Sequence, residues 1–334
     1  MNWYKNKGNE GDIVLSTRVR LARNITEYPF PVRLDEGQKK EIGNIVWNIL
    51  SENNELNLEF KDMSALSAAE TVSLAEKHLI SPEFACDNIG RSLLLSKDED
   101  ISIMICEEDH IRIQTVYPGL SLEEAFETAL RIDELLEDKL SFAFDETLGY
   151  LTQCPTNIGT ALRASVMLHL PALSKKGAMQ RLSTTVAKLG LTLRGSYGEG
   201  SEVSGDIYQL SNQVTLGISE EAAIKNLNSI ALQIIAQEKQ ARALLIKDED
   251  YLDRIYRAYG ILKSAYKLTS KELMNLISYV RVGVSEGILD IPAEKLRSMT
   301  VLLQPATLNT AAGKVLSQTE RDVLRSQKVR EELA

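Results

Sequence analysis

The sequence predicts an α+β fold, in which an antiparallel β-sheet is flanked by helices and is followed by an all-helical C-terminal domain. Two patterns support this fold class. Apolar, β-branched runs separated by short polar turns recur between residues 91 and 116, as in antiparallel hairpins. From about Ser219 onwards, apolar residues recur only with helical spacing. We therefore expect two domains, residues 1–240 and residues 241–334.

The expected strands are short and mostly alternate in polarity. DIVLSTRVRLA alternates so that Arg18 and Arg20 face one side, while Val19 and Leu21 face the core. The other expected strands lie at residues 91–96, 101–106, 111–116, 191–195 and 206–217. The last two flank a glycine-rich loop, GSYGEGSEVSG.

Helix starts are predicted from S-x-x-E capping boxes, in which the serine and glutamate side chains each accept a bond from the other's backbone N–H. Such boxes begin at Ser67, Ser121 and Ser317. CPTN, which begins at Cys154, also favours the first turn of a helix, and that helix would carry Arg163. A helix N-terminus favours the thiolate form of a cysteine, so Cys154 is a candidate nucleophile.

Composition indicates a soluble globular protein, because 44% of the residues are hydrophobic and 25% are charged. The formal net charge of −9 disfavours general nucleic-acid binding, and the apolar runs are too short to cross a membrane. The N-terminus is polar, so we expect no secretory leader, and three widely spaced cysteines favour the reducing cytoplasm. The three histidines lack metal-ligand spacing, so no protein metal site is expected.

Arginines beside apolar, structured sequence stand out in this acidic chain. Converging guanidinium groups suit a polyphosphate, because they are permanently charged and their forked donors match phosphate oxygens. Each arginine also fits a simpler interpretation, a solvated strand residue paired with a nearby carboxylate. The five candidates are Arg18, Arg20, Arg112, Arg163 and Arg194.

Two acidic candidates lie at a turn and in the glycine-rich loop. Glu108 belongs to the EEDH turn before Arg112, and Glu199 follows Arg194 by five residues. A carboxylate in such a place serves as a base or binds a cation, but EEDH also fits a plain polar turn. The loop lacks the Gly-Lys-Ser/Thr of a Walker A motif and the third glycine of G-x-G-x-x-G, so alone it indicates only a flexible loop.

Four blocks of the sequence occur in the order and spacing of a known family. STRVR, EEDHIRI, CPTNIGTALRAS and RGSYGE…GDIYQLSN together resemble the ATP:guanido phosphotransferases, the family of creatine and arginine kinases. The resemblance covers roughly residues 12–235. It implies a guanido kinase catalytic domain, with a glutamine-synthetase-like antiparallel sheet.

The resemblance assigns roles to the candidate residues. It implies that the five arginines clamp the phosphates of ATP together with Mg²⁺, and that His78 lies near the adenine or ribose. Glu108 and Glu199 would hold the acceptor guanidinium, with Glu108 as the base, and Cys154 would lie against that guanidinium instead of forming a covalent intermediate. The nucleotide-contacting residues it implies are Ser16, Thr17, Arg18, Val19, Arg20, His78, Arg112, Arg163, Ala164, Ser165, Val166, Met167, Arg194, Gly195, Ser196, Tyr197, Gly198 and Glu199.

Two departures from the metabolite kinases resemble the bacterial protein-arginine kinase branch of the family. Only fifteen residues precede Ser16, where metabolite kinases carry a helical domain, and a helical domain follows the catalytic one. The implied reaction converts ATP and protein arginine into ADP and protein Nω-phosphoarginine. RDVLRS matches the RDxxRA motif of this branch except for its final serine, and implies an allosteric phosphoarginine site at Arg321, Asp322, Arg325 and Ser326.

The branch also implies partners and a cellular role. These are a stress response, a Clp ATPase/protease that receives the marked proteins, a heat-shock transcriptional repressor as a substrate, a zinc-binding activator protein and a homodimer. Two other functions stay open: a kinase for a free guanidine such as arginine, and a non-catalytic phosphoarginine-binding regulator. All five arginines and both glutamates are present, which argues against the regulator.

Overall fold

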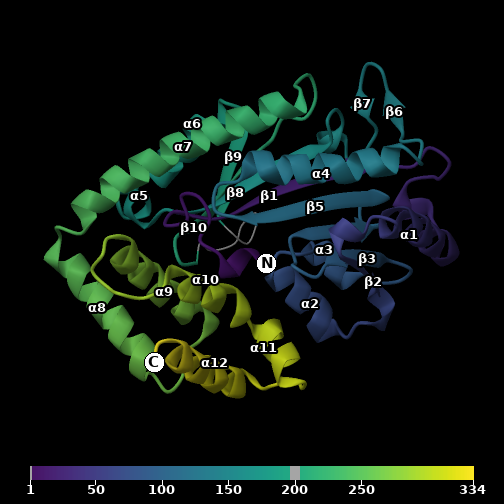
Figure 1. Cartoon of the computed structure of the whole chain (residues 1–334). Coiled ribbons are helices and arrows are strands. Elements are labelled where there is room, and N and C mark those ends of the chain that lie inside the picture. The colour runs from purple at the N-terminus through teal and green to yellow at the C-terminus, as the bar shows by residue number, and fades with distance from the viewer. Residues whose placement is uncertain (1, 196–203) are drawn as a thin grey trace.

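One large antiparallel sheet organises the N-terminal part of the chain. The computed structural model describes residues 2–195 and 204–334, and it confirms the predicted α+β class (Figure 1). Eight strands lie in the order β2-β3-β4-β5-β1-β8-β10-β9, and all neighbours are antiparallel. In that order the strands span Leu58–Asp62, Ser92–Ser96, Ile101–Ile105, Ile111–Pro118, Val14–Arg23, Leu162–His169, Ile207–Asn212 and Leu191–Gly195.

Smaller elements surround this sheet. A hairpin of β6 (Phe144–Asp145) and β7 (Gly149–Tyr150) forms a separate two-stranded sheet. Short 3₁₀ turns lie at Trp3–Lys5 (η1), Pro31–Arg33, Asn54–Leu56, Met63–Ala65 and Pro155–Asn157 (η5). The helices before the C-terminal part are α1 (Glu36–Ser51), α2 (Ala68–Glu76), α3 (Pro82–Cys86), α4 (Leu122–Glu137), α5 (Pro171–Lys175), α6 (Met179–Ala187) and α7 (Glu220–Leu245).

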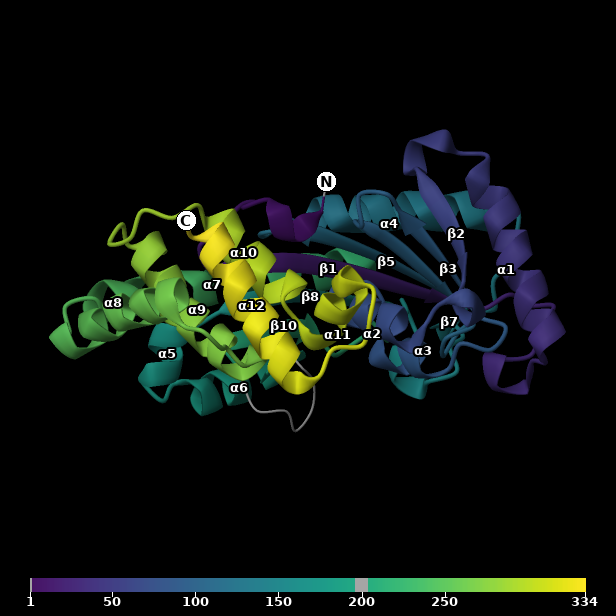
Figure 2. The ribbon, with the colours of Figure 1, turned by 90° about the horizontal axis from the view of Figure 1, so that it is seen from below.

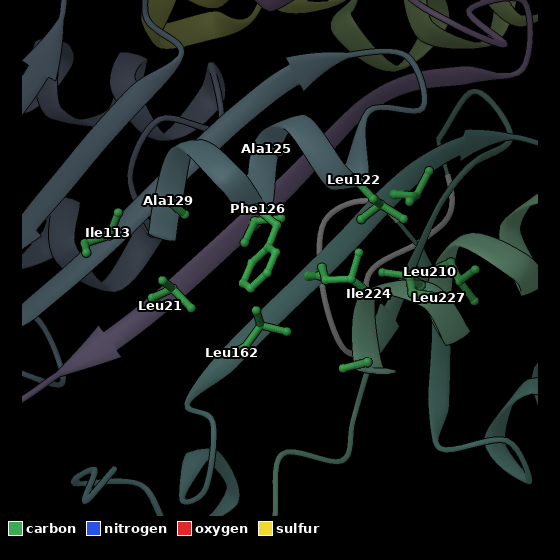
Figure 3. Close-up of a cluster of buried hydrophobic side chains, with 14 of the residues drawn as sticks. Leu21, Ile113, Leu122, Ala125, Phe126, Ala129, Leu162, Leu210, Ile224 and Leu227 are labelled. Carbon is green, nitrogen blue, oxygen red and sulfur yellow. The ribbon is translucent and has the colours of Figure 1, made fainter. Parts of the chain in front are cut away.

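Helices α4 and α7 cover one face of the sheet with apolar side chains. Leu21 of β1 lies near Phe126 of α4 and Ile113 of β5 lies near Ala129 of the same helix, while Leu210 of β10 and Leu227 of α7 belong to the same apolar layer (Figure 3). All six side chains are buried. Because burying one such side chain contributes about 1.5–3 kcal/mol, this layer fixes which face of each strand is apolar. The opposite face carries polar residues beside two smaller apolar clusters, which include Leu93 and Leu95 of β3, Met104 of β4 and Met167 of β8.

The C-terminal helices lie on the other side of the sheet from α4 and α7 (Figures 1 and 2). They are α8 (Glu249–Ser264), α9 (Ser270–Ser285), α10 (Ala293–Leu302), α11 (Pro305–Ala312) and α12 (Gln318–Glu332). They contact the N-terminal part through α11 on α2 and α10 on η1. The expected domain boundary after residue 240 falls within α7, which ends at Leu245. Among the described residues, no helix is long and apolar enough to span a membrane.

Two of the three predicted capping boxes are confirmed, and one is wrong. At Ser67 and Ser317, each serine side chain accepts a bond from the third helical residue, whose glutamate accepts one in return. Ser121 makes no such bond. Its hydroxyl instead donates to the carbonyl of Pro118 at 3.3 Å, and its N–H donates to Thr17 Oγ1 at 3.1 Å. Ser121 is therefore hydrogen-bonded to residues of β5 and β1 and does not cap α4.

The helix predicted to start at CPTN is also wrong. Only the single 3₁₀ turn η5 forms there, and Arg163 lies on strand β8. Residues 162–169 pair with both β1 and β10, so sheet hydrogen bonding overrides the local helix-start signal. The argument that a helix N-terminus activates Cys154 has no structural basis, because no helix follows that cysteine.

Candidate active site

Strand register brings the predicted arginines to the face of the sheet that α4 and α7 leave open. Arg20 on β1 lies directly opposite Arg163 on β8 and Gln114 on β5. Arg112 is two residues from Gln114 and so shares its face. Arg194 lies opposite Gln209, which in turn lies opposite Met167 of β8. Residues opposite each other in an antiparallel ladder point to the same side of the sheet. The side chains of all five arginines therefore lie on one face, which we call the arginine face.

This arginine cluster carries more positive charge than its surroundings balance. Burial, and then the charge of Arg112, lowers the pKa of Arg18 to about 10. Burial, with the charges of Arg18 and Arg112, also lowers the pKa of Arg20 well below its ordinary value. The Nε atom of Arg20 is buried and has no hydrogen-bond partner. An anion at this place would remove the repulsion and satisfy the orphaned donor, so the residues fit a polyphosphate.

Neighbouring polar groups hold three of the arginines in place. Arg18 Nη2 donates to Gln209 Oε1 at 3.2 Å. Arg112 forms an ion pair with Glu107, whose other oxygen accepts a bond from the Ser81 hydroxyl at 2.5 Å. The Nε of Arg163 donates to Asn157 Oδ1 at 3.0 Å, and its Nη1 donates to the carbonyl of Asn212 at 3.1 Å. These guanidinium groups are therefore positioned before any ligand arrives.

A cavity of about 660 Å³ opens over this face and is lined by Arg20, Arg163 and Arg194. Its size falls in the range of small-molecule and cofactor sites. Thr192 of the edge strand β9 and Gln209 and Ser211 of its neighbour β10 line the same cavity. The cavity therefore combines cationic donors with neutral polar groups.

Glu108 and Cys154 meet at the edge of the cluster. The Cys154 thiol is close enough to the Glu108 carboxylate to lower the pKa of that carboxylate, and its sulfur lies 3.1 Å from Thr156 Oγ1. Burial and the charge of Asp109 raise the pKa of Glu108, although Arg112 opposes them. A raised carboxylate pKa suits a general base working near neutral pH. These two predicted residues are therefore brought together beside the arginines.

Asp109 and Glu107 act as positioning residues that the sequence patterns did not distinguish from a polar turn. Asp109 Oδ1 accepts bonds from Asn24 Nδ2 at 2.7 Å and from the Gln153 N–H at 2.8 Å. The second bond ties the EEDH turn to the loop that carries Cys154. Both acids are buried, and no pattern in the sequence indicates that burial.

The remaining predicted residues fall into four groups. His78 has a left-handed φ of 61°, and burial and the charge of Arg18 lower its pKa to about 4, so it lies beside the arginine cluster. Glu199 lies outside the described residues, as do Ser196, Tyr197 and Gly198. Strand alternation places the next group on the core face, and these side chains are buried: Thr17, Val19, Ala164 and Val166. Strand alternation places Ser16, Ser165 and Met167 on the arginine face, while Gly195 lines the cavity at the end of β9.

The C-terminal motif is arranged asymmetrically on α12. Arg325 is 1% exposed and donates to the carbonyls of Leu303 at 2.9 Å and Leu268 at 2.8 Å, and to Asp322 at 2.6 Å. Ser326 donates to the carbonyl of Ala265 at 2.6 Å. Arg321 is partly exposed and donates to the carbonyl of Leu316 at 2.6 Å. Arg325 thus joins three segments, while Arg321 lies nearer to solvent.

No group of three or more His, Cys, Asp or Glu side chains that could hold a metal ion occurs in residues 2–195 and 204–334. Mg²⁺ at phosphate-transfer sites is held by few carboxylates and by the substrate phosphates themselves. The arginine face therefore suits a nucleotide that brings its own ion.

The sequence comparisons decide the family. The family of the ATP:guanido phosphotransferase C-terminal catalytic domain matches residues 41–241, and that of the protein-arginine kinase McsB C-terminal domain matches residues 248–334. A protein-arginine kinase from Halothermothrix orenii is 47% identical over 99% of this chain and 96% of its own length. The chain belongs to the protein-arginine kinases, within the ATP:guanido phosphotransferase family. A protein-arginine kinase from Caldanaerobacter subterraneus is 45% identical over 96% of this chain and 97% of its own.

The fold of this chain is similar to those of guanidino kinases whose structures have been solved. The duplicated taurocyamine kinase from Schistosoma mansoni, with bound transition-state analogue components, is 28% identical and has a TM-score of 0.60. The match covers 70% of this chain and 35% of that duplicated one. Lombricine kinase, at 24% identity, has a TM-score of 0.61 over 71% of this chain and 69% of its own, and supports the fold alone.

Replacing Cys154 with serine is expected to weaken turnover without abolishing it. Serine keeps a hydrogen-bonding group beside Glu108 but loses the ionisable, polarisable sulfur, and direct phosphoryl transfer needs no covalent enzyme intermediate. We expect kcat to fall by about tenfold, with the KM for ATP unchanged, in a steady-state assay of ADP release. Complete loss of turnover in a variant that still binds ATP would instead indicate a nucleophilic cysteine.

Proposed function

We propose that this chain transfers the γ-phosphoryl group of ATP to arginine side chains of proteins, giving ADP and protein Nω-phosphoarginine. The observation that carries the proposal is the position of the Glu108–Cys154 pair beside the arginine face. Cationic donors for a polyphosphate and a carboxylate of raised pKa are both required for this transfer, and here they are adjacent.

The chemistry divides between these two groups. Arg18, Arg20, Arg112, Arg163 and Arg194 bind the phosphates and offset the negative charge that spreads over the transferring phosphoryl group. Mg²⁺ would be held mainly by the phosphates of ATP and would supply further neutralisation of their charge. A guanidinium nitrogen attacks phosphorus, the bond from phosphorus to the β–γ bridging oxygen breaks, and ADP leaves. Glu108 accepts the proton that the nitrogen loses.

We assign Glu108 as the base because burial and the charge of Asp109 raise the pKa of its carboxyl. A guanidinium is a poor nucleophile because its charge is delocalised and its pKa exceeds about 12. A carboxylate held against it orients the nitrogen and accepts the proton as the N–P bond forms. Glu199, outside the described residues, would hold the guanidinium from the glycine-rich loop.

A comparison of acceptors tests the proposal. We expect Mg²⁺·ATP turnover with an unfolded, arginine-containing protein, and at least tenfold lower kcat/KM with free arginine. Phosphate on free arginine alone would make the chain a metabolite kinase. ADP release that does not depend on the acceptor would indicate ATP hydrolysis and contradict the proposal, and no turnover at all would favour a phosphoarginine-binding regulator.

The helical C-terminal part is proposed to regulate this activity. Arg321, Asp322, Arg325 and Ser326 would bind phosphoarginine, with the more exposed Arg321 as the direct phosphate contact. The further proposals are a cytoplasmic homodimer, a zinc-binding activator protein, and a stress response in which a Clp ATPase/protease receives the marked proteins. A heat-shock transcriptional repressor is the proposed regulatory substrate.

Arg325 and Arg321 should differ sharply in their effect on stability. Arg325→Ala leaves the carbonyls of Leu303 and Leu268 without their donor, so we expect the free energy of unfolding to fall by about 2–4 kcal/mol. Arg321→Ala should cost less than about 1 kcal/mol, because its side chain is partly exposed. Urea unfolding of both variants measures the difference, and equal losses would contradict the asymmetry.

A further inference from the structure

A second cavity adjoins the nucleotide cavity. It has a volume of about 530 Å³ and lies between the β6–β7 hairpin and the start of α7. Thr215 and Leu216 line both cavities, so the two are contiguous. Tyr150, at the end of the hairpin, lines the second cavity four residues before Cys154. The second cavity is therefore next to the loop at which we place the acceptor arginine.

The charged groups lining this cavity are acidic. Among the described residues, its charged lining consists of Glu220 and Glu221. Glu221 hydrogen-bonds to its own backbone N–H and to Ser219, as acids in the first turn of a helix often do. Glu220 instead forms an ion pair with Arg23: its buried Oε1 lies 3.6 Å from Arg23 Nη2. The Glu220 side chain is nevertheless 20% exposed and lines the cavity, so it presents a carboxylate there.

Behind the cavity wall, the guanidinium of Arg23 forms ion pairs with two carboxylates, those of Asp133 and Glu220. Arg23 Nη2 lies 2.6 Å from Asp133 Oδ2, and both side chains are almost fully buried. The Oδ1 atom of Asp133 has no hydrogen-bond partner. Burial raises the pKa of both Asp133 and Glu220, and the charge of Asp133 adds to the effect on Glu220, while Arg23 opposes the shift of both groups. The cluster thus carries excess negative charge, which a cation from outside would balance.

An aromatic pair adds a surface for the hydrocarbon part of such a cation. Phe144 packs edge-on against Tyr150 with ring centroids 5.2 Å apart, and Phe144 is 57% exposed. The guanidinium of Arg23 already lies 3.5 Å from the centroid of Tyr150. Leu148 is 43% exposed beside them. A long basic side chain could lay its methylene groups on Phe144 and place its charge near Glu220.

We propose that this cavity binds a second basic side chain of the protein substrate, carried on the same segment as the acceptor arginine. The inference rests on the proposed protein-arginine kinase activity and extends it to the choice of substrate. Free arginine offers no second basic side chain to this cavity. Recognition at two places would raise affinity for protein segments over free guanidines without changing the chemical step.

Paired peptides test this proposal. Each unstructured peptide carries one acceptor arginine, and a lysine lies two, three or four residues from it on either side, with alanine in the matched peptide. We expect the KM of the native chain to be about tenfold lower for the best lysine peptide, with kcat unchanged. Glu220→Gln should bring the KM values of the pair to within about twofold, while the KM for ATP stays the same.

Control variants keep the test independent of folding. Glu249→Gln alters a first-turn glutamate of α8, away from this cavity, and should retain the lysine preference. Phe144→Ala removes an exposed ring and should lower the preference with no change in melting temperature. Equal KM values for lysine and alanine peptides in the native chain, or a preference that survives Glu220→Gln, would overturn this inference alone. No phosphoarginine on any peptide or protein would overturn the proposed function itself.

Discussion

Replacing Glu108 with glutamine is expected to lower kcat by about 10²–10⁴-fold, the usual contribution of a positioned general base. Glutamine keeps the size of the side chain and a hydrogen-bond acceptor beside the Cys154 thiol, but it cannot take a proton. The arginine face is untouched, so the affinity for ATP should not change. Single-turnover kinetics and calorimetric titration with ATP measure the two quantities separately.

The dependence of kcat on pH tests whether Glu108 is the base. A base works when it is deprotonated, so kcat should fall as the pH drops through the pKa of Glu108. Burial and Asp109 raise that pKa, so the acidic limb should lie above the ordinary glutamate value of about 4.3. In Glu108→Gln this limb should disappear, whereas in the exposed control Glu59→Gln it should stay. Normal turnover in the Glu108→Gln variant would show that Glu108 is not the base.

Replacing Arg20 with methionine should lower kcat/KM by about 10³-fold or more, because arginines that face a transferring phosphoryl group contribute on that scale. The same change should not destabilise the fold. Arg20 is a buried charge with an unpartnered Nε and a lowered pKa, so methionine removes repulsion from Arg18 and Arg112. Loss of activity with an equal or higher melting temperature is the expected signature.

A matched arginine separates the phosphate role from general charge. Arg33, which lies outside the arginine cluster, is exposed, so Arg33→Met should leave kcat/KM within about twofold. ATP protection against thermal unfolding supplies a second measurement, since a ligand that binds the native state raises its stability. Full ATP protection in Arg20→Met would contradict its assignment to the phosphates.

The shared face of the arginines could be predicted because a strand alternates with a period of two. Arg18 and Arg20 follow that rule directly, with Val19 and Leu21 buried on the other side. Arg163 could not be placed in the same way, since CPTN carries the local signals of a helix start. Its strand is decided by pairing with β1 and β10, and such long-range pairing leaves no mark in a short window of sequence.

Burial of polar groups was the main feature that the sequence did not reveal. Asp109 and Glu107 belong to a turn whose sequence is uniformly polar, yet each accepts a hydrogen bond from a residue far away in the chain, Asn24 and Ser81 respectively. The sequence motif places Arg325 in the same expected phosphoarginine site as Arg321. The burial of Arg325 depends on the carbonyls of Leu268 and Leu303, which only the packing of α12 supplies.

Mass spectrometry under non-acidic conditions tests the central claim most directly, because the N–P bond of phosphoarginine is labile in acid. A model protein would be incubated with Mg²⁺·ATP and either the native chain or Glu108→Gln. The account predicts phosphate on arginine residues of the protein with the native chain and its near-absence with the variant. Phosphate confined to serine, threonine or free arginine, or undiminished arginine phosphorylation by Glu108→Gln, would contradict it.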